Sequence, residues 1–180
     1  MSGNAIAGER SWPPIATSLV NSLPEYGVCI NAATLRMMKM TGLGLPIFDK
    51  AIQDANRWVN DVMDELDWED KHRAFTLLRS TLHVLRDRLQ ANESAHFAAQ
   101  LPTLMRGVFY EGYQPSRSTP LIRHKDEFVD AVMAAFNDAP EEDPASVVGA
   151  ALDVIADHIS EGEMDDVKSS LPKEIRDLWY

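Results

Sequence analysis

Residues 58–110 of the chain read WVNDVMDELDWEDKHRAFTLLRSTLHVLRDRLQANESAHFAAQLPTLMRGVFY. A second stretch, 70 positions further on, matches this one without a gap: residues 128–180 read FVDAVMAAFNDAPEEDPASVVGAALDVIADHISEGEMDDVKSSLPKEIRDLWY. Repetition at a fixed period indicates a duplicated structural unit that keeps its core positions while its surface diverges. The sequence therefore predicts two tandem units of one design. The apolar pairs include Trp58 with Phe128, Leu82 with Leu152, Leu85 with Ile155, Leu101 with Leu171, and Phe109 with Trp179.

The first unit shows the spacing of α-helices. Apolar residues recur three and four positions apart over residues 48–66 and again over residues 75–89, which places them on one face of a helix. Asp67 is expected to cap the second of these helices, and Asn92 a short third one. Pro102 suits the first turn of a fourth helix. The second of the four helices has the widest apolar face, so we expect it to be central and most buried.

The second unit repeats this order. We expect a helix over residues 124–137, an acidic loop, and a long helix that starts at Pro144 behind Asp143 as its N-cap. Ser160 and Glu163 have the spacing of a capping box for the next helix. No segment alternates polar and apolar residues over a useful length, so no β-strand is expected. We predict an all-α protein in which two tandem four-helix units form a pseudo-two-fold helical bundle.

This prediction divides the chain into four parts. Residues 46–112 are the first helical repeat, residues 113–123 a linker rich in turn-forming residues, and residues 124–180 the second repeat. Residues 1–44 form either a disordered extension or the product of a mis-assigned start, since Met40 is a plausible natural first residue. An ordinary flexible tail stays open as the alternative.

Charge and composition argue against several classes of protein. The net charge of −11 opposes nucleic-acid binding, and it is uneven: residues 40–110 carry −2 and residues 111–180 carry −10. No apolar run approaches the roughly 20 residues that span a membrane, and no secretory signal is visible. The single cysteine, Cys29, excludes an internal disulfide. We expect a cytoplasmic protein that binds neither nucleic acid nor membrane.

Candidates for catalytic or metal chemistry are few. Glu93 and His96 have the Glu-x-x-His spacing of carboxylate-bridged di-iron bundles, but the matching positions, Glu163 and Asp166, hold no histidine. A carboxylate in the first turn of a helix is favoured in any case, so a structural role for Glu93 is the preferred interpretation. No nucleophile setting or phosphate loop is present. We therefore expect no catalytic residue, no cofactor and no metal, with Glu93 and His96 as weak metal candidates.

A basic stripe on the second predicted helix is the most suggestive surface feature. It comprises His72, Arg79, His83 and Arg86, whose spacing places them beside the apolar face. Guanidinium groups bind carboxylates bidentately, so these four residues are candidates for binding an acidic protein surface, with both arginines expected to face solvent. A solvated helix face without a binding role is the alternative, and it is favoured.

Three blocks of the sequence carry a resemblance to a known family: NRWVNDVMDELDWEDKHRAFTLLRSTLHVLRDRL, AAQLPTLMRGVFYEGY and EGEMDDVKSSLPKEIRDLW. In combination and order they resemble the prokaryotic family catalogued as domain of unknown function 2267, over roughly residues 46–180. The resemblance implies a small, all-helical bacterial or archaeal protein without an established activity. The resemblance also implies that, in some members, the domain is linked to a regulatory domain such as the CBS type. The family supplies no catalytic residue to carry over.

Three functional classes follow from these observations. The first is a non-catalytic interaction or regulatory module. Its protein partner is unidentified, and a second copy of the chain is one candidate. The second is a small-molecule binder with a pocket between the two units, where duplicated bundles often leave a cleft. The third, which only Glu93 and His96 favour, is a metal-dependent enzyme. We favour the first class.

Overall fold

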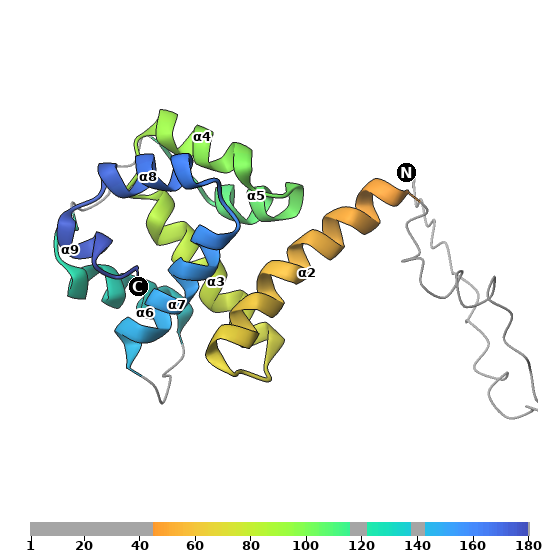
Figure 1. Cartoon of the computed structure of the whole chain (residues 1–180), viewed down its shortest axis with the longest axis horizontal. Helices are drawn as coiled ribbons and strands as arrows, with labels where there is room; N and C mark the ends of the chain where they lie inside the picture. The colour runs from red at the N-terminus through yellow and green to blue at the C-terminus, as the bar shows by residue number, and fades with distance from the viewer. Residues whose placement is uncertain (1–44, 116–121, 138–142, 180) are drawn as a thin grey trace, which may run out of the picture. The chain divides into compact units, whose positions relative to one another are not determined.

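The computed structural model describes residues 45–115, 122–137 and 143–179, which belong to one compact unit spanning Thr41–Tyr180. The predicted extension over residues 1–44 and the centre of the predicted linker lie outside the described residues. The described part is all-helical, as predicted, with eight helices and no strand (Figure 1). The helices are α2 (Pro46–Leu66), α3 (Lys71–Arg86), α4 (Ala91–Gln100), α5 (Thr103–Tyr110), α6 (Lys125–Phe136), α7 (Pro144–Asp157), α8 (Glu161–Ser170) and α9 (Lys173–Arg176).

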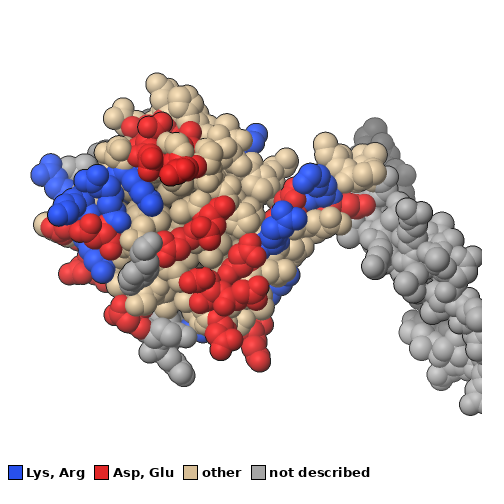
Figure 2. Space-filling model, viewed as in Figure 1, with Lys and Arg blue, Asp and Glu red and all other residues tan. Residues whose placement is uncertain are grey.

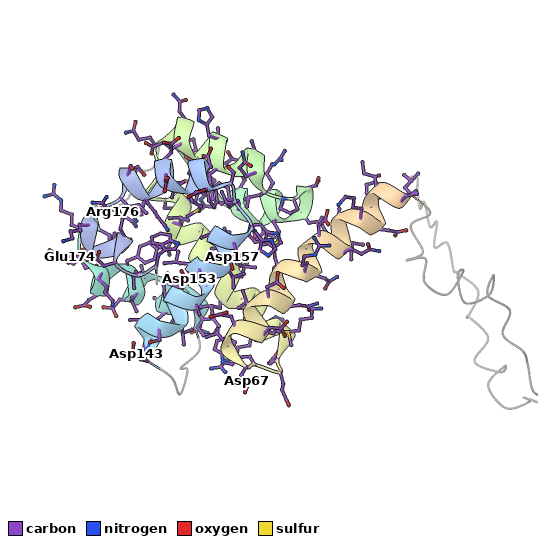
Figure 3. All side chains as sticks on the ribbon, in the orientation of Figure 1. Asp67, Asp143, Asp153, Asp157, Glu174 and Arg176 are labelled. Carbon is purple, nitrogen blue, oxygen red and sulfur yellow. The ribbon has the colours of Figure 1, made fainter. Side chains whose placement is uncertain are left out.

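Helix α2 begins at Pro46, whose fixed φ suits the first turn, and it ends one residue before Asp67. The prediction that Asp67 caps the next helix is wrong. Asp67 instead has φ 50° and terminates α2, because Asp is among the few residues that tolerate the left-handed region. Asn137, 70 positions further on, ends α6 in the same way with φ 54°. Figure 3 labels Asp67 at this turn.

The N-cap of α3 is Asp70, whose Oδ1 accepts hydrogen bonds from the backbone N–H groups of His72 and Arg73 at 2.8 and 3.2 Å. Asp143 caps α7 as predicted, with Oδ2 3.1 Å from the backbone nitrogen of Ser146. The predicted role of Asn92 is wrong, because Gln90 precedes α4 as its N-cap. Ser160 precedes α8 but makes no side-chain capping bond, so only half of that prediction holds.

Helix α3 is the central helix, as the width of its apolar face predicted. It contacts α2, α5, α6 and α7. The residues that fill the core from α3 have counterparts 70 positions further on in α7, and both sets are completely buried: Leu77, Leu78, Leu82 and Leu85 from α3, and Val147, Val148, Leu152 and Ile155 from α7.

Helix contacts recur between the two halves of the chain. Helix α2 packs on α3 as α6 packs on α7, α3 packs on α6 as α7 packs on α2, and α2 packs on α5 as α6 packs on α9. The halves differ at their ends. Phe109 is completely buried, whereas Trp179 is half-buried and donates its indole N–H to the carbonyl of Leu152 at 3.1 Å. The eight-residue α5 corresponds in sequence to the four-residue α9.

Candidate functional site

Three members of the basic stripe, Arg79, His83 and Arg86, lie against the C-terminal end of α5. Arg79 Nε is 2.7 Å from Glu111 Oε2, and His83 Nε2 is 2.7 Å from the carbonyl oxygen of Val108. Arg86 donates to the carbonyls of Phe109 and Glu111 at 2.6 and 3.0 Å. The two bonds from Arg86 thus reach backbone carbonyls at the end of α5, where helices leave carbonyls without intrahelical partners, and the positive charge of Arg86 suits that end of the helix dipole.

Arg86 is the clearest departure from the sequence-based picture. Only 5 % of the residue is exposed, so the prediction that it faces solvent is wrong. Its Nε donates to Asp87 Oδ1 at 2.8 Å, and its guanidinium lies over the ring of Tyr113, with 5.0 Å between the guanidinium carbon and the ring centroid. The long side chain reaches the end of α5 because hydrogen-bond acceptors converge there. Arg86 is therefore a structural residue.

Burial and charge set the protonation of this cluster. Burial lowers the pKa of His83, and the Val108 carbonyl opposes that effect only in part. Because a carbonyl only accepts, the neutral ring carries its proton on Nε2. The hydrogen bond from Arg79 lowers the pKa of the exposed Glu111 carboxyl and raises the pKa of Arg79. At neutral pH the cluster thus holds a neutral histidine beside an ion pair.

The matching positions in α7 lack these groups. Gly149, Asp153 and Ala156 stand where α3 has Arg79, His83 and Arg86. Helix α9, which corresponds to α5 and whose end such groups would contact, has only four residues. The loss of basic residues in the second half is thus accompanied by a shorter final helix. The partner-binding role of the stripe stays a prediction, with His72 as its only member outside these contacts to α5.

The weak metal candidates, Glu93 and His96, line a polar hollow between α4 and α8, of about 380 Å³, together with Glu163 and Asp166. Glu93 already has a structural role, because its Oε2 accepts the backbone N–H of Gln90 at 2.9 Å and completes the capping box of α4. Within residues 45–115, 122–137 and 143–179, no group of three or more His, Cys, Asp or Glu residues is placed to hold a metal ion.

A mainly apolar groove lies between α2, α3 and α5, and sequence reasoning missed it. Its volume is about 470 Å³. We call it the α2–α5 groove, and its apolar lining consists of Ile52, Ala55, Val59, Phe75, Leu104, Met105 and Val108, with Asn56, Lys71 and His72 at polar positions. His72, one of the four residues predicted to bind a partner, thus lies at this groove rather than with the rest of the basic stripe.

Four large apolar side chains at the start of α2 and of α5 are exposed, and one of them, Leu104, lines the groove. Leu45, Ile47 and Phe48 at the start of α2 are 52 %, 71 % and 49 % exposed, and Leu104 at the start of α5 is 43 % exposed. Figure 1 shows why: the first turns of α2 extend beyond the other helices, so nothing in the described residues covers them. Large exposed apolar patches on a folded protein commonly mark a binding surface.

The second half of the chain lacks such an apolar rim. Position 174, which matches Leu104, is a glutamate, and its Oε2 lies 3.1 Å from Nδ1 of His124. Figure 3 shows Glu174 at the edge of the body opposite the projecting end of α2. Helix α6 has 12 residues against 21 in α2, so it has no equivalent of the projecting turns. This excess length over the repeat was the sequence signal for the groove.

No described helix is both long enough and apolar enough to cross a membrane. The family model described as "Uncharacterized conserved protein (DUF2267)" matches residues 55–178, and the chain belongs to that family, as its sequence resemblance predicted. No curated protein matches the chain. The matched region begins at Ala55, so the projecting turns of α2 over residues 46–54 precede it.

Proposed function

We propose that this protein is a non-catalytic interaction module that binds an amphipathic helix of a protein partner in the α2–α5 groove. The observation that carries the proposal is the apolar groove itself, with the exposed Leu104 in its lining and the exposed Phe48 one turn before Ile52 on the same face of α2. Binding an amphipathic helix through its apolar face is a recurring mode of recognition for such grooves.

The chemistry of the groove favours binding over catalysis. Its lining contains two titratable residues, Lys71 and His72, and both are exposed at the start of α3. General acid–base or nucleophilic chemistry needs groups that are held against one another and against the substrate. An apolar floor with a charged rim instead suits a helix whose apolar face is buried and whose polar face stays in water.

The arrangement that presents the groove belongs to the same proposal. We infer two tandem four-helix units related by a pseudo-two-fold axis, supported by the reciprocal helix contacts and by the matched buried positions of α3 and α7. On this view the projecting turns of α2 are an addition to one of two similar units. Superposition of residues 58–110 on residues 128–180 tests this, and helices packed in a different order would contradict it.

Site-specific photo-crosslinking in the native host tests the binding function. A benzophenone amino acid replaces Leu104 at the rim of the groove, and a matched variant carries it at Asp130, which is exposed on α6. We expect a discrete crosslinked protein, or a crosslinked dimer of the chain, from position 104 and none from position 130. The same products from both positions, or none from position 104, would refute the proposal.

A small-molecule ligand is the second candidate, because about 470 Å³ lies within the range of roughly 300–1,000 Å³ that is common for ligand pockets. A thermal-shift screen with apolar metabolites distinguishes the two functions. A ligand that raises the melting temperature of the wild type but not of Leu104→Glu would favour small-molecule binding. We expect no such ligand, because the groove opens onto the projecting turns of α2 rather than enclosing a closed cavity.

A further inference from the structure

The first turns of α2 are themselves an amphipathic helix. Phe48, Ile52 and Ala55 lie at spacings of four and three along one face, and this face borders the α2–α5 groove. The opposite face carries Lys50, whose Nζ is 2.7 Å from Asp54 Oδ2, together with the exposed side chain of Ile47. The molecule therefore carries both an apolar groove and, in the wall of that groove, a helix of the kind that such a groove binds.

We propose that the occupant of the groove is α2 of a second copy of this chain, so that two copies form an isologous dimer through residues 45–55 and the groove. This inference rests on the proposed function and names its partner. Two-fold symmetry lets each copy give its projecting helix and receive the helix of the other. The exposed side chain of Phe48, on the same face as Ile52, then gains apolar neighbours.

Charge supports a second copy as the partner. The whole chain carries −11, which opposes self-association through most of its surface, yet residues 45–60 hold two acidic and two basic residues and are neutral. In Figure 2 both signs of charge are visible on the projecting part of α2, whereas acidic side chains dominate the middle of the same face of the body. The entering helix brings Asp49, and the rim that it meets carries Lys71 and His72. The contact thus has opposite charges at its edge.

The exposed area predicts a weak dimer. Leu45, Phe48 and Leu104 are each about half exposed, and with roughly 150–250 Å² for a large side chain they offer on the order of 300 Å². A standard interface buries about 800 Å² of each partner, so the groove lining is needed as well. We therefore expect a dimer that forms at high protein concentration and dissociates on dilution.

Analytical ultracentrifugation of the full chain tests the proposal, from about 5 to about 500 µM, which spans the dissociation constants of weak interfaces. We expect the wild type to shift from monomer to dimer over this range. Phe48→Glu and Leu104→Glu each place a charge in the apolar contact, and each is expected to raise the dissociation constant by at least about tenfold. Leu104→Glu also installs the residue type that stands at the matching position 174.

Gln53→Glu is the matched control, because it adds the same charge to an exposed position of α2 outside the apolar stripe. It should dimerise as the wild type does. Thermal melts at low concentration should show that all three variants keep the fold, because the substituted side chains are exposed. A dimer that persists equally in Phe48→Glu and Leu104→Glu would overturn the proposal by placing the interface elsewhere.

A wild type that is monomeric at every concentration would also overturn the proposed dimer. That result would not contradict the proposed function, which the crosslinking experiment tests independently. Position 104 would then yield a product that contains a foreign protein rather than two copies of the chain. The two proposals can therefore fail separately.

Discussion

Replacing Arg86 by methionine removes the guanidinium group and keeps much of the side-chain stem. In the native structure this group is the donor to two backbone carbonyls at the end of α5, those of Phe109 and Glu111. The substitution leaves the buried Phe109 carbonyl without its charged donor. The Glu111 carbonyl is only partly buried, so water can replace part of its lost bond.

The expected loss of unfolding free energy is about 2–4 kcal/mol. A hydrogen bond to a charged group contributes about 1.5–3 kcal/mol, and an unsatisfied buried carbonyl costs about 1–3 kcal/mol. The variant no longer buries a guanidinium group, which costs free energy in the native protein. This gain offsets part of the loss, so the expected loss is smaller than the sum of the two contributions. Arg79→Met is the control, because Arg79 is 36 % exposed and surface substitutions usually change stability by no more than about 0.5 kcal/mol.

Urea unfolding followed by far-UV circular dichroism at neutral pH measures both variants. We expect the midpoint of Arg86→Met to fall well below that of the wild type with an unchanged slope, and the midpoint of Arg79→Met to stay close to it. If Arg86→Met unfolded within about 0.5 kcal/mol of the wild type, the structural role assigned to Arg86 would be refuted.

Three further predictions concern the core, a helix cap and a titrating group. Leu82→Ala and Leu152→Ala, both at completely buried positions, should each lower the unfolding free energy by about 2–5 kcal/mol in urea melts, and losses below about 1 kcal/mol would mean that the core is misplaced. Asp70→Ala should cost about 1 kcal/mol in the same assay through the lost N-cap of α3, whereas no loss would contradict its capping role. Because burial lowers the pKa of His83, the unfolded chain binds more protons below about pH 6.5, and stability should fall as pH drops through that value. His83→Gln should weaken this fall between about pH 7.5 and pH 5, and an unchanged pH dependence would show that His83 does not cause it.

Much of the fold follows from local patterns. Pro46 and the Asp143-Pro144 pair placed the starts of α2 and α7 correctly, and the apolar spacing placed the buried faces of α2 and α3, because caps and periodicity act within a few residues. The caps at Asp70 and Gln90 were missed by two or three positions. Several polar residues compete at each of those turns, and tertiary packing decides which one adopts the capping geometry.

The site was less predictable because it depends on contacts between distant segments. The spacing of Arg79, His83 and Arg86 predicted a common face, and they do share one, but only the fold brings the carbonyls of α5 to that face. The α2–α5 groove extends from the repeated part of α2 into its excess length at Ile52, next to a leucine at position 104. Comparing the two halves of the chain for length as well as for matched residues would have drawn attention to it.

The central claim is that the α2–α5 groove binds the first turns of α2 from a second copy, and methyl NMR of the full chain with a defined probe tests it most directly. The probe is a peptide with the sequence of residues 45–60, LPIFDKAIQDANRWVN, and the control peptide carries the Phe48→Glu change. We expect saturable shifts of the methyl signals of Ile52, Leu104 and Val108, no shift of the buried Leu152, and no response to the control peptide. Absence of shifts at the groove, or equal shifts with the control peptide, would contradict the claim.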